Sequence, residues 1–368
     1  MKLKIATVLG TRPEITKLSP VLPLLDAEFE NILIHTGQHY DYNMDRAFFE
    51  DLRLRDPDYQ LNIGSGTHAV QTGNMMIKIE EVLMKEKPRA VVVFADPNTP
   101  LAGALAAVKL GIPVIHMEAG CRSFNRKMPE EINRILVDHC SNLLLAPDKT
   151  AHDNLITEGI PENKIKTVGS TVFDVCARNK AFAESAKILE KLGITPQKYI
   201  IATIHRAENT DNLEVLHGLI SAFNTISRKM KIIFAIHPRT KKRIQTTNIK
   251  FDSGVTLVDA PTYFDFLKLL CNSRFVLTDS GGIQEEAAAF NVPAVVTRNE
   301  TEWTYLTDAG KNVLASTNPE KIIQIASELI ESDSKLNEMK SKSVGLAFGA
   351  SQNVVNAIKE YLQNEPEK

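Results

Sequence analysis

Short, continuously apolar runs alternate with stretches of helical periodicity along most of this 368-residue chain. Apolar runs without polar positions are typical of strands buried on both faces of a parallel sheet. The expected strands are 3–9, 31–36, 90–94, 114–115, 142–146, 165–168, 199–204, 231–236, 255–258, 275–278 and 294–296. The expected helices are one through 17–22 and others at 48–54, 72–85, 101–110, 129–140, 173–192, 212–230, 263–271, 283–290 and 350–362. This alternation predicts an α/β fold with two doubly wound, Rossmann-like parallel-sheet domains facing a central cleft.

The alternation pauses once, in a charged helical segment that Gly193 and Pro196 end. At about 100–200 residues per domain, the length of the chain also indicates two domains. We therefore expect an N-terminal domain over 1–172, a C-terminal domain over 173–348, and a closing helix over 349–368 that crosses back to the N-terminal domain.

Composition narrows the class of protein. Hydrophobic residues make up 43% and charged residues 24% of the chain, which is typical of a globular protein. A net charge of −2 gives no basic excess for nucleic acid, and no apolar run approaches the roughly 20 residues of a membrane helix. The four scattered cysteines favour neither a disulfide framework nor a zinc site. We expect a cytoplasmic protein without a metal, a nucleic-acid partner or a membrane segment.

The stretch 116–134 gathers many ionisable groups at the end of an expected strand, including Glu118, Glu130 and Arg134. A helix is predicted to begin at Pro129, since proline suits the first helical turn. The carboxyl ends of parallel strands are where α/β proteins bind ligands. A structural role is the alternative, because acidic residues in a first turn complement the helix dipole and Glu130 with Arg134 forms an i,i+4 pair.

A second signal is Ser280-Gly281-Gly282, which lies between an expected strand and a helix. Such a turn presents backbone N–H groups at a helix N-terminus and favours a phosphate, to which Ser280 adds a hydroxyl. Glu286, about one turn further on, suits a ribose diol. The alternative is a plain glycine-rich turn with solvated glutamates.

Three other strand ends carry candidates. The turn 10–14 has one glycine and no G-x-G-x-x-G fingerprint, so we expect no nicotinamide or flavin. Its Arg12 and the nearby Lys17 suit a phosphate or carboxylate, or else lie on a solvated helix face. His205 and His237 suggest anion binding or acid/base chemistry. Asp96 is a further candidate, although a helix cap is the simpler interpretation.

Together these loops resemble the non-hydrolysing UDP-N-acetylglucosamine 2-epimerase family over nearly the whole chain. The residues that carry the resemblance are 10–14 with Lys17, 36–39, Asp96, 116–120, 129–134, 205–209 and 280–286. The resemblance implies a GT-B-like fold, a nucleotide bound mainly by the C-terminal domain, a homodimer, and no cofactor, whether metal or nicotinamide.

The resemblance also implies roles for single residues. Asp96, Glu118, Glu130 and His205 match catalytic positions, Lys17 and Arg134 match supporting ones, and Arg12, His237, Ser280, Gly281, Gly282 and Glu286 match the UDP site. The implied reaction interconverts UDP-GlcNAc and UDP-ManNAc by elimination and re-addition of UDP through a glycal-like intermediate, for cell-surface polysaccharide precursors. In this scheme Arg134 keeps Glu118 or Glu130 ionised, and Glu131 stays on the helix surface.

The chain also departs from the family pattern at several positions. Prolines surround Asp96, Tyr40 follows His39 where many members have an arginine of a regulatory site, and Trp303 follows Glu302. These departures leave the exact sugar and any regulatory second substrate site open. The alternatives are a 2-epimerase of a diacetamido-uronic or deoxy-sugar nucleotide, a GT-B glycosyltransferase, a non-catalytic sensor, or a hydrolysing epimerase.

Overall fold

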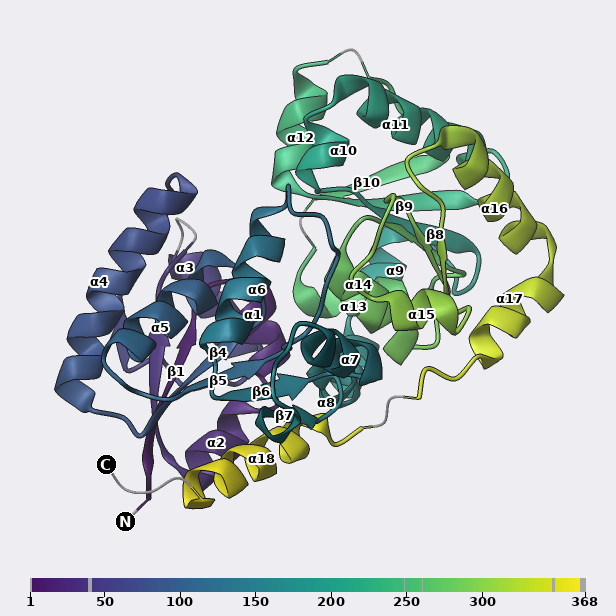
Figure 1. Ribbon diagram of the computed structural model, residues 1–368. Coiled ribbons are helices and arrows are strands. Elements are labelled where there is room, and N and C mark those ends of the chain that lie inside the picture. Colours follow the sequence, from purple (N-terminus) through teal and green to yellow (C-terminus); the bar gives the residue numbers. More distant parts are fainter. Residues whose placement is uncertain (1, 39–41, 248, 260, 346–347, 365–368) are drawn as a thin grey trace. The chain divides into compact units, whose positions relative to one another are not determined.

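The computed structural model describes residues 2–38, 42–247, 249–259, 261–345 and 348–364. The chain divides into two compact units, residues 1–175 with 346–368, and residues 176–345. Each unit contains one parallel β-sheet with helices packed against it (Figure 1). The expectation of two parallel-sheet α/β domains is therefore confirmed.

The first unit is built on a seven-stranded sheet. Its strands are β1 (Lys4–Leu9), β2 (Glu30–His35), β3 (Tyr59–Gln60), β4 (Ala90–Phe94), β5 (Val114–Met117), β6 (Leu143–Ala146) and β7 (Ile165–Thr167). Its helices are α1 (Arg12–Leu18), α2 (Leu22–Glu28), α3 (Tyr42–Asp51), α4 (His68–Glu86), α5 (Asn98–Lys109), α6 (Pro129–Cys140), α7 (Lys149–Thr157), the 3-10 turn η1 (Glu162–Lys164) and α18 (Ala350–Asn364). Helix α8 (Thr171–Ser185) begins in this unit and ends in the second.

The second unit is built on a six-stranded sheet. Its strands are β8 (Tyr199–Thr203), β9 (Lys231–Ile236), β10 (Val255–Asp259), β11 (Val276–Thr278), β12 (Ala294–Val296) and β13 (Asn312–Leu314). Its helices are α9 (Ile188–Leu192), α10 (Ala207–Thr210), α11 (Leu213–Ser227), α12 (Pro238–Gln245), α13 (Tyr263–Asn272), α14 (Gly281–Ala289), α15 (Thr304–Asp308), α16 (Pro319–Glu331) and α17 (Asp333–Ser341).

Strand order defines one switch point in each sheet. The first sheet has the order β3-β2-β1-β4-β5-β6-β7 and the second β10-β9-β8-β11-β12-β13. The direction of winding reverses between β1 and β4, and again between β8 and β11. Open α/β sheets bind ligands outside the carboxyl ends of the strands at such points. The loops that follow these four strands are therefore the expected ligand-binding loops.

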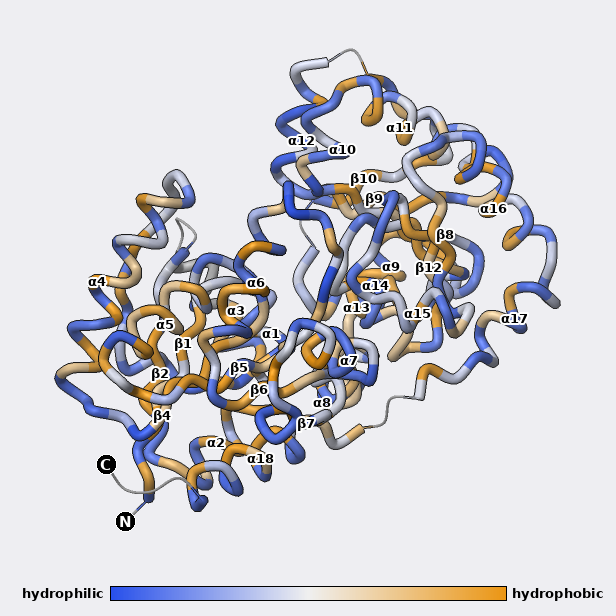
Figure 2. The backbone as a smooth tube through the Cα atoms, viewed as in Figure 1, coloured by the Kyte–Doolittle hydropathy of each residue, from blue (hydrophilic) through white to orange (hydrophobic). Residues whose placement is uncertain are grey.

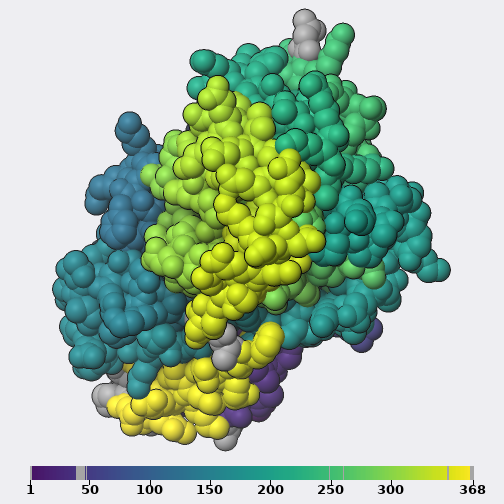
Figure 3. Space-filling view, turned by 90° about the vertical axis from the view of Figure 1, so that its right-hand side faces the viewer, coloured from purple at the N-terminus to yellow at the C-terminus, as the bar shows by residue number. Residues whose placement is uncertain are grey.

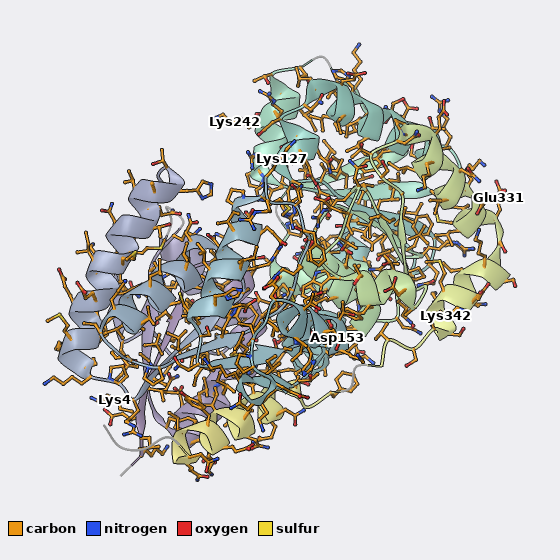
Figure 4. The ribbon with its side chains drawn as sticks, viewed as in Figure 1. Lys4, Lys127, Asp153, Lys242, Glu331 and Lys342 are labelled. Atoms are coloured by element: carbon orange, nitrogen blue, oxygen red, sulfur yellow. The ribbon has the colours of Figure 1, made fainter. Side chains whose placement is uncertain are left out.

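Apolar burial explains why the strands form sheet interiors. Every residue of β4 and of β8 is buried. Figure 2 shows hydrophobic residues, in orange, along the strands of each unit. Charged side chains on the periphery pair in solvent, as Glu331, labelled in Figure 4, does with Lys229. Exposed pairs of this kind contribute about 0–1 kcal/mol, so the cores and not the surface charges stabilise the two units.

The C-terminal helix α18 packs against α2 and β6 of the first unit. Figure 3 shows these C-terminal residues beside the N-terminal part of the chain. Lys359 of α18 pairs with Glu28 of α2 at 2.7 Å, and the Asp174 carboxylate accepts hydrogen bonds from the backbone of Gly349 and Ser351. No helix in the described part of the chain is long and apolar enough to cross a membrane.

Two kinds of element differ from the sequence-based expectation. The single helix expected through 17–22 is two helices, α1 and α2, because Pro20 between them has no N–H to continue the first. Sequence reasoning also missed β3, α7, α10, α12, α15, β13, α16 and α17. Helix α16 could have been predicted from the sequence, since Asn318 caps it and Pro319 occupies its first turn.

Candidate functional site

The turn after β1 is held by a buried carboxylate. Glu14 Oε2 accepts hydrogen bonds from the backbone of Gly10 at 3.1 Å and Thr11 at 2.8 Å, and from the Thr11 hydroxyl at 2.7 Å. Gly10 is required here because a Cβ would lie 1.9 Å from Thr36 Oγ1. This rigid turn begins α1, which carries Arg12 and Lys17.

Lys17 lies against one of the predicted catalytic carboxylates. Its ammonium donates to Glu118 Oε2 at 2.5 Å and lies 5.8 Å from the centre of the Phe94 ring. Arg12, further back on α1, stacks its guanidinium over Phe48 at 5.2 Å. The structure thus brings Lys17 and Glu118 together, although 101 residues separate them.

Glu118 occupies an unusual backbone conformation. Its φ is +65°, in the left-handed region, directly after β5. Ala95, directly after β4, has a φ of +59°. Such conformations cost about 1–3 kcal/mol in residues other than glycine, and they cluster at functional sites, although some also end helices, as Lys87 does. Because Phe94 pairs with Met117 across β4 and β5, these strained residues begin two neighbouring loops.

Asp96 is held by a buried arginine. Arg134 of α6 donates to Asp96 Oδ2 from Nε at 2.9 Å and from Nη2 at 2.5 Å, while Asn133 donates to the Asp96 carbonyl at 2.8 Å. The arginine is 4% exposed. Arg134 forms ion pairs with Asp96 and Glu131, and the expectation that it supports Glu118 or Glu130 stays a prediction.

The expectation that Glu131 is a helix-surface residue is wrong. Glu131 is 1% exposed and accepts hydrogen bonds from the backbone of Ser123 at 3.0 Å and Phe124 at 2.8 Å. Burial raises the pKa of Glu131, but these amides and Arg134 lower it by more, so the net pKa lies below its ordinary value. The loop before α6 folds over the helix, which periodicity along the helix does not reveal.

Glu130 differs from its neighbour. It lies in the first turn of α6, is partly buried, and forms no hydrogen bond or ion pair with any residue that the structure describes. Within the first unit, Asp96 and Glu118 therefore each have a cation, and Glu130 has none among these residues.

Several other charges of the 116–134 stretch have structural roles. His116 Nδ1 lies 2.6 Å from Asp138, and its Nε2 lies 3.0 Å from the Ala95 carbonyl oxygen. Arg122 donates to Asp138 at 2.7 Å and to Glu158 at 2.6 Å. Burial raises the pKa of Asp138, but the His116 and Arg122 charges outweigh it, and the net pKa is lowered. This cluster lies in the interior of the unit.

In the second unit, the loops after β8 and β9 bring two predicted residues together. The His205 and His237 rings lie 5.6 Å apart, centre to centre. His205 Nδ1 lies 2.9 Å from the buried Asp279, whereas His237 Nδ1 accepts from the Arg239 N–H and caps α12. Sequence reasoning assigned no role to Asp279, although it ends a strand as Asp96 does.

The glycine turn begins α14 as predicted. Ser280 is the N-cap, and its hydroxyl accepts from the Ile283 N–H. A Cβ on Gly281 would lie 2.4 Å from Glu302 Oε1, whereas nothing lies within 4 Å of one on Gly282. Glu302 is itself held by two arginines, Arg206 and Arg298. The turn therefore has open space on the Cβ side of Gly282.

Glu286 lies farther along α14 and is partly buried. One of its carboxylate oxygens accepts from the Tyr263 hydroxyl at 3.1 Å. Burial, and then the negative charge of Glu286, raise the pKa of Tyr263. This hydrogen bond helps to position the Glu286 carboxylate. His39, which carries part of the family resemblance, and Tyr40, which stands where many members have a regulatory arginine, lie outside the described residues.

Glu14 makes the stability of the first unit depend on pH. Burial, assisted by the Asp96 charge, raises the pKa of Glu14 from 4.5 to about 8. The folded state therefore holds a proton that the unfolded state releases between these values. We expect the free energy of unfolding to fall as pH rises through this window, by up to about 1.4 kcal/mol per pH unit. Urea unfolding followed by circular dichroism measures this slope.

The matched variant is Glu14→Gln, which resembles the protonated acid and does not titrate. We expect it to lose that part of the slope. An identical pH dependence in both proteins would contradict the assignment of the titration to Glu14.

Comparison with known proteins places this geometry in a family. The family model described as UDP-N-acetylglucosamine 2-epimerase matches residues 25–359. The chain belongs to the UDP-N-acetylglucosamine 2-epimerase family. Members of this family are isomerases, so the family and the enzyme class expected from the sequence are confirmed.

Relatives match this epimerase over most of their length. The UDP-N-acetylglucosamine 2-epimerase of Methanococcus maripaludis is 48% identical over 344 residues, which cover 91% of this chain and 93% of that protein. The UDP-2,3-diacetamido-2,3-dideoxy-D-glucuronate 2-epimerase of Pseudomonas aeruginosa is 43% identical over 328 residues, 88% of this chain and 91% of that one.

A solved structure matches the epimerase fold equally well. The UDP-GlcNAc 2-epimerase of Methanocaldococcus jannaschii, in complex with UDP-GlcNAc and UDP, has a TM-score of 0.88 at 44% identity. The match covers 98% of this chain and 100% of that chain. The GT-B-like fold class is confirmed by this likeness.

Proposed function

We propose that this epimerase interconverts UDP-GlcNAc and UDP-ManNAc by elimination and re-addition of UDP. The observation that carries the proposal is the pair of carboxylates, Asp96 and Glu118, on neighbouring loops, each against its own cation. Acid/base chemistry on both faces of one carbon needs at least two such groups. The names of the relatives support the same substrate class.

The chemistry explains why carboxylates are needed. The C2–H of an N-acetylhexosamine is a very weak acid, because no carbonyl lies beside it. Departure of UDP from C1 gives that carbon oxocarbenium character, which acidifies C2–H. A carboxylate then takes the proton and a glycal-like intermediate remains. Protonation at the opposite face, with UDP returning to C1, gives the 2-epimer.

We assign the acid/base roles to the first unit. Glu118, Asp96 and Glu130 are the candidates, with Lys17 and Arg134 as supporting cations. The left-handed backbone of Glu118 and its ion pair with Lys17 support a positioned group over a solvated one. Glu130, without a partner in the described structure, is available to exchange a proton.

We assign most of the UDP contacts to the second unit. The N-terminus of α14 at Ser280, Gly281 and Gly282 offers N–H groups to the diphosphate. His205 and His237 add donors beside it, and Glu286 suits the ribose. Arg12 of the first unit supplies a further cation. Fixed donors of this kind stabilise the charge that develops on the leaving diphosphate.

A related sugar is the second candidate substrate. The Pseudomonas relative favours it, because a chain 43% identical is named as a 2-epimerase of a diacetamido-glucuronate. The C2 chemistry is the same for both sugars, so the acid/base residues do not discriminate between them.

We further propose that the protein is a cytoplasmic homodimer and that its product is a precursor of cell-surface polysaccharide.

The deciding experiment is hydrogen exchange. We expect incubation with UDP-GlcNAc in deuterated water to place deuterium at C2 of both epimers. A panel that includes UDP-ManNAc and the diacetamido-glucuronate identifies the preferred sugar. Absence of C2 exchange with every UDP-sugar of the panel would rule out the proposed function, and UDP release that requires an acceptor would indicate a glycosyltransferase.

A further inference from the structure

His205 and Asp279 begin two loops at the same level of the second sheet. Strands β8 and β11 are parallel neighbours, and Thr203 pairs with Thr278 at their ends. The hydroxyls of these two threonines lie 2.7 Å apart. The chain therefore delivers His205 and Asp279 to one place at the switch point of this sheet, 74 residues apart in sequence.

Asp279 accepts hydrogen bonds from four groups. Oδ1 lies 2.9 Å from His205 Nδ1, and the carboxylate also accepts from the backbone N–H of His205 at 3.0 Å and of Arg206 at 2.9 Å. Asn209 Nδ2 completes the set at 3.0 Å. The same Asn209 nitrogen lies 3.1 Å from the Thr297 carbonyl oxygen, so it must be the NH₂ group and not the oxygen.

This set of donors decides where the protons are. Backbone N–H groups and an amide NH₂ only donate, so these partners favour the ionised form of the Asp279 carboxyl. Because an ionised oxygen only accepts, His205 Nδ1 carries the proton that lies between them. Burial raises the pKa of Asp279, but the bond and charge of His205 and the backbone amides outweigh burial and leave the net pKa lowered.

We propose that Asp279 is a positioning residue that holds His205 as the Nδ1–H tautomer and presents Nε2 to the ligand. The inference rests on the proposed function of His205 beside the departing diphosphate. Asp279 is fully buried, whereas the His205 side chain is 35% exposed, so the ring and not the carboxylate is accessible. The arrangement repeats the logic of a carboxylate that orients a catalytic imidazole.

The position of Asp279 in sequence connects two parts of the UDP site. It directly precedes Ser280, the N-cap of α14. One buried carboxylate thus fixes the ring orientation of His205 and lies next to the predicted phosphate turn. When the ring is charged, Asp279 stabilises that charge, and Nε2–H donates a hydrogen bond to a diphosphate oxygen.

The first test needs only the unmodified protein. Labelling with ¹⁵N-histidine allows NMR to distinguish the two ring nitrogens, and His205→Gln assigns the His205 signals. We expect neutral His205 to be protonated at Nδ1. His237 is an internal reference for the opposite tautomer, because its Nδ1 accepts from the Arg239 N–H. An Nε2–H tautomer at His205, or an equal mixture, would overturn the proposal.

The second test is Asp279→Asn. The amide oxygen can keep the backbone donors, so its NH₂ then faces His205 Nδ1 and donates to it. We expect the His205 tautomer to switch to Nε2–H, and kcat for C2 exchange to fall about 10³-fold with KM within about threefold. If Asp279 had only a structural role, the His205 tautomer would stay unchanged in Asp279→Asn. That result in a folded variant would overturn the proposal.

The matched control is Asp333→Asn. Asp333 pairs with Arg274 in the second unit, and its side chain is 81% exposed. We expect this variant to leave the His205 tautomer and the kinetics of C2 exchange unchanged.

If Asp279→Asn does not fold, the His205 tautomer of the unmodified protein still tests the proposal. If the unmodified protein shows no C2 exchange with any UDP-sugar, the proposed function fails while the NMR result still tests the tautomer.

Discussion

Glu118→Gln is expected to lower the rate of deuterium incorporation at C2 by about 10³-fold, since one general acid/base group contributes about 10²–10⁴. Glutamine keeps the size of the side chain and an oxygen to accept from Lys17, but it cannot take the C2 proton. The Kd for UDP should stay within about twofold, because the UDP contacts are assigned to other residues. Isotope exchange followed by NMR and UDP titration by calorimetry measure the two quantities.

The control for this variant is Glu81→Gln, at an exposed position of α4. It removes a charge of the same kind from the same unit and should leave both quantities unchanged. If Glu118→Gln instead loses most of its affinity for UDP, Glu118 contacts the nucleotide, and the acid/base assignment is wrong.

Asp138→Ala is expected to lower the free energy of unfolding of the first unit by about 3–5 kcal/mol. The change leaves His116 and Arg122, which are 0% and 2% exposed, without the carboxylate that lies between them. A buried charge without its partner retains the full desolvation penalty. Because the pKa of Asp138 is lowered in the folded state, this contribution is present above its ordinary pKa of 3.8 and is lost as pH falls below it.

The two units can be followed separately in this experiment. Trp303, the single tryptophan of the chain, is buried in the second unit, so its fluorescence reports that unit. Circular dichroism reports both. We expect an earlier urea transition by circular dichroism than by fluorescence.

The control is Asp153→Ala, which removes an exposed partner of Lys149 and should cost less than about 1 kcal/mol. Asp153, labelled in Figure 4, belongs to α7 of the same unit. A loss of similar size for the exposed and the buried aspartate would contradict the role assigned to the buried cluster.

The hydrophobic pattern was sufficient for the fold class. Strands such as β4 and β9 lie where continuous apolar runs predict them, because a strand buried on both faces must be apolar at every position. Short elements escaped this reasoning. Strand β3 has two residues and α10 has four, too few for either period to appear.

The pattern of strand ends also located the candidate residues. His205, Asp96 and Glu118 each follow a strand within two residues, and the ends of parallel strands lie at one edge of a sheet. The same rule applied to Asp279 would have found it. Its role was missed because the glycines that follow it drew attention to the phosphate turn alone.

The partners of the charged side chains were a matter of tertiary structure. The i,i+4 spacing of Glu130 and Arg134 predicts a pair on one helix, yet Arg134 binds Asp96, 38 residues away, and Glu131. Apolar periodicity is a local property, and it decides which residues become strands and where each strand ends. Which carboxylate meets which cation depends on the order of the strands and on burial, which leaves an ion no stable position without a counter-charge or donors. For Arg134, Glu131 and His205, that pairing was settled only when distant loops packed together.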